Sequence, residues 1–353
     1  PLIDENGDIV IDKKGRPVSD HNKDDSEDIP LSMDIDSYMQ RYVIPFNNNA
    51  WADTKKRKTG YTIPFTRFFY QFEDFHELDE IAKSLAGSRS QSACSLAHRL
   101  ESCPPLDIEH SSNESWLGDI PKDWELLRIG DLFELRSTKV SDEEYRPLSV
   151  TKGGIVPQLS SVAKSDNHSN RKLVCKGDFA INSRSDRRNS CGFSPYEGSV
   201  STITTVLYPR CQIVSRYFDL LFNTPRFAEE FYRWGHGIDS DIWTTSWSDM
   251  KKIVVPCPPI EVQKAIVAYL ANELKEMRVA RMLVKAELDN SIFDLVSDSL
   301  SAIDAVKADE DHSSAIQEKL EHRIENLENT LNSIDSAEAT LVFEVVTGKR
   351  VVL

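Results

Sequence analysis

The sequence predicts an α+β protein with a mixed α/β domain, a long antiparallel helical hairpin and a small N-terminal segment that is mostly irregular or helical. Two observations carry this prediction. Residues 120–258 place short β-branched segments between turn signals, and residues 259–353 repeat apolar side chains at helical spacing. The chain has 353 residues, of which 40% are hydrophobic, so it is long enough for two or three domains with cores of their own.

The N-terminal part is predicted to contain little regular structure. Residues 1–30 are polar and charged without a hydrophobic period, which indicates a flexible acidic arm. Residues 31–101 are richer in aromatic and apolar side chains. Within them, the pattern predicts a short helix over 33–42, with Asp34 near its start, and another helix over 77–101.

A linker and a mixed domain follow. Prolines, serines and a glycine interrupt residues 102–119, which is typical of a linker. In the domain at 120–258, residues 214–234 have helical spacing across a break at Pro225. Strands are expected at 126–129, 146–150, 172–174, 178–182, 200–208 and 253–256.

Residues 259–353 predict two long amphipathic helices with a polar break near 309–314. Pro259 suits a first helical turn, and Gly348 suits a helix end. Apolar residues of the second helix alternate steps of four and three, which is a heptad seam with a defect at Glu338. We expect an antiparallel hairpin that acts as a coiled-coil spacer. A simple packed helical bundle is the alternative.

The charge is unevenly distributed along the chain. A net charge of −15 argues at first against a nucleic-acid partner. Residues 1–119 carry 13 Lys and Arg against 22 Asp and Glu, a net of −9, and residues 261–353 carry 10 against 18, a net of −8. Residues 120–260 carry 19 against 17, a net of +2. Phosphate binding depends on where cations cluster, so the middle third can bind nucleic acid; a chance contrast is the alternative.

Motifs for catalysis, metal binding and membrane insertion are absent from the sequence. The six cysteines form no CxxC pair, and no histidines have HxxxH spacing, so no zinc site is expected. There is no P-loop, no GxGxxG after a strand, no GxSxG, and no Asn-Pro-Pro-aromatic or Asp-Pro-Pro-aromatic tetrapeptide. Neither a signal peptide nor a run of about 18 apolar residues is present. We expect a cytoplasmic, non-catalytic protein without a cofactor of its own.

Several segments of residues 120–353 resemble specificity subunits of Type I restriction–modification systems. The most specific match is residues 253–266, Ile-Val-Val-Pro-Cys-Pro-Pro-Ile-Glu-Val-Gln-Lys-Ala-Ile. This segment resembles the family's junction between a DNA target-recognition domain and a spacer helix, although Val262 stands where a glutamate is common. The other matching segments are 120–125, 129–133, 175–182, 215–221 and 343–349.

A second resemblance concerns residues 30–85. The segments 31–38, 50–53 and 60–70 resemble the C-terminal tail of the Type I modification subunit, whose methyltransferase domain is absent here. The composition and the resemblance together predict five parts. They are a flexible acidic arm at 1–30, a tail-like segment at 31–101, a linker at 102–119, a target-recognition domain at 120–258 and spacer helices at 259–353.

The resemblance implies a half specificity subunit. A full subunit has two recognition domains, so one domain is expected to read half of a bipartite site, and a homodimer through the spacer helices would restore a symmetric reader. The implied partners are double-stranded DNA, an N6-adenine methyltransferase subunit that binds S-adenosylmethionine and, in a larger complex, a restriction–translocation subunit. Residues 272–312 have no counterpart in the family, which leaves the spacer length open. A decoy protein that docks on such subunits, or a fragment of a methyltransferase–specificity fusion, are the alternatives.

Three loops are the candidate DNA contacts. The first follows the expected strand at 178–182 and combines arginine, asparagine and serine, which contact phosphates and base edges. The second has a threonine pair whose methyl groups suit thymine, and glycines in the third allow close backbone approach. The candidate residues are Asn182, Ser183, Arg184, Ser185, Arg187, Arg188 and Asn189; Trp243, Thr244 and Thr245; and Lys152 and Gly153. Solvated surface turns are the alternative interpretation.

Overall fold

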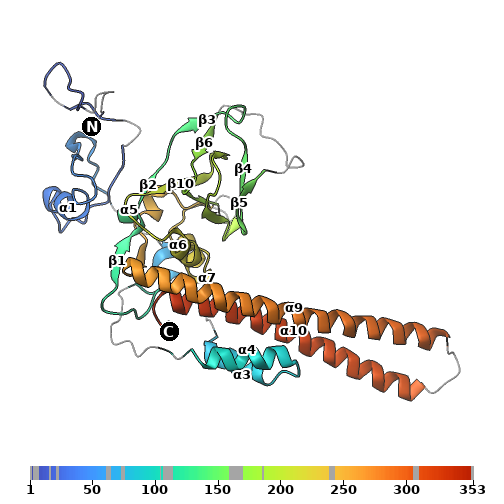
Figure 1. Cartoon of the computed structure of the whole chain (residues 1–353). Coiled ribbons are helices and arrows are strands. Elements are labelled where there is room, and N and C mark those ends of the chain that lie inside the picture. The colour runs from blue at the N-terminus through green and yellow to red at the C-terminus, as the bar shows by residue number, and fades with distance from the viewer. Residues whose placement is uncertain are drawn as a thin grey trace. The chain divides into compact units, whose positions relative to one another are not determined.

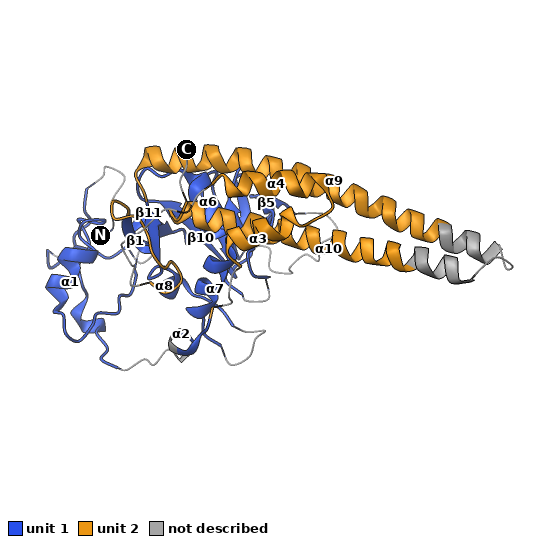
Figure 2. Ribbon diagram, turned by 90° about the horizontal axis from the view of Figure 1, so that it is seen from below, with its two compact units in different colours: residues 1–71, 125–257 blue, residues 72–124, 258–353 orange. Residues whose placement is uncertain are grey.

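The chain contains both helices and strands, so the predicted α+β class is confirmed. The computed structural model divides into two compact units, which Figure 2 colours separately. The β-rich unit comprises residues 1–71 and 125–257, and the helical unit comprises residues 72–124 and 258–353. The structure describes all residues except 1, 3–7, 16, 21–23, 61–64, 73–75, 104, 106–113, 159–169, 185–186, 238–242, 305–309 and 351–353.

Short antiparallel strands form the framework of the β-rich unit (Figure 1). They are β1 (Glu125–Arg128), β2 (Phe133–Leu135), β3 (Lys139–Val140), β4 (Leu148–Thr151), β5 (Gly154–Pro157), β6 (Arg171–Val174), β7 (Phe179–Asn182), β8 (Cys191–Phe193), β9 (Gly198–Val200), β10 (Thr204–Pro209) and β11 (Val254–Cys257). One sheet has the order β2-β10-β7-β8, a second has β3-β6-β9, and β1-β11 and β4-β5 form two further pairs. The short helices α5 (Ile129–Leu132) and α8 (Trp247–Met250) precede β2 and β11.

One expected strand, over 200–208, is instead divided between β9 and β10, which belong to different sheets. The break is a turn in which the Thr204 N–H donates to the Ser201 carbonyl at 3.0 Å. The carbonyl of Ile203 accepts hydrogen bonds from both the backbone N–H and the hydroxyl of Ser183, at 3.3 and 2.5 Å. Tertiary hydrogen bonds therefore override the β propensity of this run.

The helical stretch predicted over 214–234 forms α6 (Ser215–Phe222) and α7 (Pro225–Arg233), with the break at Pro225 as expected. Proline fits this first helical position because its missing N–H would have no partner there. Phe222 at the end of α6 packs its ring 4.9 Å from that of Phe179 in β7. This aromatic core fixes both helices against the strand that carries the first candidate loop.

The N-terminal residues of the β-rich unit include α1 (Ile35–Tyr42), close to the predicted helix, with Asp34 as its N-cap. Part of the expected flexible arm also makes specific contacts. The buried Lys251 Nζ lies 2.9 Å from Asp25 and 3.2 Å from Glu27. Ion pairs with a buried lysine hold these acidic residues on the β-rich unit. The prediction of a flexible arm over residues 1–30 did not include such contacts.

Two helices in the helical unit replace the single one expected over 77–101. They are α3 (Leu78–Ala86) and α4 (Gln91–Glu101), which pack against each other. The chain turns at Gly87, whose N–H donates to the Lys83 carbonyl. The sequence pattern missed this turn because apolar residues on the two helices continue with helical spacing.

The expected helical hairpin consists of α9 (Ile260–Asp304) and α10 (Glu310–Val346), which pack side by side in antiparallel directions (Figure 1). Gly348 follows α10 with φ of +75°, and a Cβ atom there would lie 2.7 Å from the Pro121 ring. Glycine therefore meets both a conformational and a steric requirement at this helix end.

Candidate nucleic-acid interface

The first candidate loop connects β7 to β8, and we call residues 183–190 the arginine loop. All four residues of β7 are buried. At the base of the loop, the Asn182 N–H donates to the Ser190 carbonyl at 2.9 Å. The Arg184 N–H donates to Asn182 Oδ1 at 3.0 Å. A buried strand thus anchors the loop, and an asparagine side chain shapes its first turn.

The second candidate segment lies directly beside the arginine loop. Thr244 forms an antiparallel bridge with Arg184, and the Thr245 N–H donates to the Ser183 carbonyl at 3.0 Å. On its other side, Thr244 exchanges two backbone hydrogen bonds with His236, at 2.9 and 3.0 Å. Two segments that are well separated in the sequence therefore form one surface.

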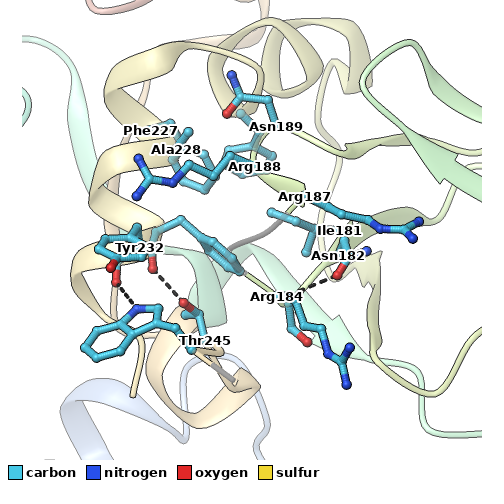
Figure 3. A pocket seen from close by; sticks show the side chains of 14 residues that line it. Ile181, Asn182, Arg184, Arg187, Arg188, Asn189, Phe227, Ala228, Tyr232 and Thr245 are labelled. Carbon is cyan, nitrogen blue, oxygen red and sulfur yellow. Dashed lines mark hydrogen bonds between the residues drawn. The ribbon is translucent and has the colours of Figure 1, made fainter. Parts of the chain in front are cut away.

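A small pocket opens between the arginine loop and α7 (Figure 3). Arg188 extends toward Tyr232, whereas Arg184 and Arg187 extend to the opposite side (Figure 3). The lining residues are Ile181, Asn182, Ser183, Arg184, Arg187, Arg188, Asn189, Phe222, Phe227, Ala228, Phe231, Tyr232, Trp243 and Thr245. Among the arginines described in this loop, only the Arg188 guanidinium therefore lies beside the aromatic side chains of the pocket.

Exposure divides the candidate residues into two groups. Those at the surface are Arg184, Arg187 and Arg188, and those half-buried are Ser183, Asn189, Trp243 and Thr244. Asn182 and Thr245 are only 6% and 2% exposed. The Thr245 hydroxyl donates to the Phe231 carbonyl at 2.7 Å, so it holds its segment on α7 and faces no ligand. The predicted thymine contact is therefore restricted to Thr244. Ser185 lies outside the described residues.

Tyr232 is a candidate that sequence reasoning missed. The guanidinium carbon of Arg188 lies 4.3 Å from the centre of the Tyr232 ring, which is a cation–π contact. The Trp243 ring stacks on Tyr232 with centroids 5.2 Å apart, and its Nε1 donates to the Tyr232 carbonyl at 2.9 Å. The one available signal was its place in an aromatic-rich helix, next to Phe231 on the core face.

The third candidate loop is the exposed turn between β4 and β5. Lys152 and Gly153 occupy this turn and do not line the pocket. The following residue, Gly154, lies against β8, since a Cβ atom built on Gly192 would be 3.0 Å from the Gly154 Cα. The turn is therefore near Gly192 in β8, which is two residues beyond the arginine loop.

The cations of the arginine loop differ from others in the β-rich unit. Arg136 pairs with the buried Asp178 at 2.6 Å, and this hydrogen-bonded contact raises the pKa of Arg136. Burial lowers the pKa of Lys172, whose Nζ donates to a carbonyl in β10. Arg184 and Arg188, by contrast, are exposed at the surface, where a guanidinium group can meet an anion.

A metal site or a membrane-spanning helix would each require a particular arrangement of the residues that the structure describes. No group of three or more His, Cys, Asp or Glu side chains there is arranged to hold a metal ion. No helix among them combines the length and the hydropathy of a membrane span.

No protein-family model matches the sequence, and no curated protein is similar to it. The solved structures that resemble the chain include two from Type I restriction–modification systems. One comes from work on the assembly and conformational transition of the type I R-M system, with a TM-score of 0.41, 15% identity, and coverage of 52% of this chain and 50% of that one. The other is the HsdS subunit from Thermoanaerobacter tengcongensis, with a TM-score of 0.33, 16% identity, and coverage of 73% and 49%. This chain spans about half the length of both.

Proposed function

We propose that the chain is the DNA-recognition component of a Type I restriction–modification system. In this proposal it is a half specificity subunit that reads one half of a bipartite site and performs no chemistry itself. It directs an N6-adenine methyltransferase, which binds S-adenosylmethionine, and a nuclease, both on other chains. Residues 120–258 form the recognition domain, residues 259–353 the spacer, and residues 31–101 a segment that resembles the C-terminal tail of the modification subunit.

The arginine loop is the observation that carries this proposal. It presents three exposed arginines from a buried strand, beside a second polar segment. Arginine can bind guanine O6 and N7 with two hydrogen bonds, and it can also bind phosphates. A loop that is anchored on a buried strand and carries long cationic side chains is suited to a groove of the duplex. The edges of the nucleobases lie there between phosphates.

A homodimer with a coiled-coil spacer is part of the proposal. The packing of α9 against α10 along the hairpin supports a rigid spacer. A second copy of the chain would place a second recognition domain at a fixed distance from the first, as an inverted site requires.

Selection of bound duplexes from a random pool by the full chain, at moderate salt, tests the proposal. We expect enrichment of a short motif, either alone or inverted around a fixed gap. The inverted form requires two recognition domains and hence a dimer. A pool without enrichment after several rounds would reject sequence reading by the chain alone, and would mean that the chain either needs its methyltransferase partner or is a decoy that docks on restriction–modification subunits.

Single substitutions then locate the reading surface. Arg184→Ala and Arg187→Ala should each weaken binding to the selected duplex by about 1–3 kcal/mol if the side chain reads a base. The matched control is Lys176→Ala, because Lys176 is an exposed cation at the opposite end of β7. Unchanged affinity in both arginine variants would remove the arginine loop from the interface.

A further inference from the structure

The helix α2 (Phe65–Phe69) makes specific contacts with the C-terminal turn of α7. The Arg67 guanidinium lies 3.9 Å from the centre of the Trp234 ring. In return, Arg233 Nη1 donates to the Arg67 carbonyl at 3.1 Å. A cation–π contact and a backbone hydrogen bond together fix where this segment lies on α7.

The same turn of α7 is itself held by a buried carboxylate. Glu230 accepts two hydrogen bonds from Arg233, at 2.7 and 2.9 Å, and one from Trp234 Nε1 at 2.7 Å. Arg233 and Trp234, which contact Arg67, are therefore themselves held by hydrogen bonds to Glu230.

A chain of ring contacts leads from this turn to the arginine loop. The ring of Tyr70, directly after α2, lies 6.1 Å from that of Tyr232 with an angle of 54° between the planes. Tyr232 in turn stacks on Trp243 and carries the Arg188 guanidinium at 4.3 Å. Tyr232 therefore contacts both Tyr70 and Arg188, which is one of the three exposed arginines of the arginine loop.

We propose that residues 65–70 brace the DNA-reading surface, with Tyr70 as a positioning residue that holds Tyr232 and, through it, Arg188. This inference rests on the proposed function for its consequence in DNA binding. A long arginine side chain loses much rotamer freedom when it is ordered, so a ring that orders it beforehand increases affinity. DNA recognition by residues 182–190 thus depends on a segment that lies more than a hundred positions earlier in the sequence.

The test compares Tyr70→Ala with Tyr70→Phe in the full chain. The first readout is the NMR signal of the Arg188 Nε–H group, which the Tyr232 ring current shifts when the guanidinium lies over the ring. The second readout is affinity for the selected duplex. Phe69→Ala is the matched control, because Phe69 is an aromatic residue of α2 that is 76% exposed. Arg67→Ala is a second variant, which removes the contact of Arg67 with the Trp234 ring.

We expect Tyr70→Ala to move the chemical shift of the Arg188 Nε–H toward the value that it has in Tyr232→Ala, which lacks the ring. Tyr70→Phe and Phe69→Ala should leave this chemical shift unchanged. Duplex affinity should fall about two- to fivefold in Tyr70→Ala, and by less than that when Arg188→Ala is already present. An unchanged Arg188 signal in both Tyr70→Ala and Arg67→Ala would overturn the brace. If the unmodified chain binds no duplex, the proposed function is rejected. The Arg188 NMR signal would still show whether residues 65–70 hold Tyr232 and Arg188 in place.

Discussion

The α9–α10 hairpin and the arginine loop differ in what holds them in place. Along the hairpin, Val284, Ile334 and Leu341 are buried in a seam of repeated apolar contacts. The arginine loop, by contrast, is held by backbone hydrogen bonds and by single polar side chains such as Asn182. Stability is distributed over many residues in the first region and concentrated in a few in the second.

This difference corresponds to two requirements of the proposed function. A spacer must keep its length and direction, and many small apolar contributions make it insensitive to any exposed substitution. A loop that reads DNA must be able to present different side chains while its backbone keeps the same conformation. Because the support of the arginine loop comes mostly from backbone groups, its exposed side chains can be replaced with little effect on folding.

The largest effect is expected in the seam of the hairpin. Ile334→Ala should lower the free energy of unfolding of the helical unit by about 2–5 kcal/mol, because Ile334 is 0% exposed and its loss leaves a cavity. Urea unfolding followed by circular dichroism measures this change. Phe293→Ala is the control on the same hairpin, since Phe293 is 72% exposed and should change stability little. Equal losses in the two variants would contradict a seam at Ile334.

The hairpin was also the region that the sequence predicted best. A period of 3.6 residues needs only local information, so the two long helices and their end at Gly348 follow from the pattern. The same holds for the break at Pro225. The division of the expected strand over 200–208 could not be predicted, because Ile203 bonds to Ser183 across the fold.

The candidate interface was predictable in part. Arginine and asparagine after a strand marked residues 182–190, and the structure places Thr244 beside them. Sequence alone could not separate exposed from supporting residues, because burial of Thr245 depends on α7. Tyr232 was missed for the same reason, since its role comes from Arg188 and Trp243 rather than from its neighbours in the chain.

A medium effect is expected at the base of the arginine loop. Asn182→Ala removes the oxygen that accepts from the Arg184 N–H, and we expect a loss of about 1–2 kcal/mol in the stability of the β-rich unit. Duplex binding should weaken as well, because Arg184 is no longer held. Asn182→Asp keeps an acceptor at this position and should restore folding more fully than alanine. Urea unfolding and duplex titration of both variants measure the two effects. An alanine variant with full stability and full affinity would show that this side chain does not shape the loop.

The smallest effect is expected at the turn between β4 and β5. If Lys152 meets a phosphate, Lys152→Ala should weaken binding about equally for all duplexes and reduce the slope of log affinity against log salt by about 1. Titrations of selected and unrelated duplexes over a series of salt concentrations measure this slope, with Lys176→Ala as the matched exposed cation. A change confined to the selected duplex would instead assign Lys152 to base reading, because phosphate contacts carry no sequence preference. An unchanged slope would leave the arginine loop and the Thr244 segment as the whole of the interface.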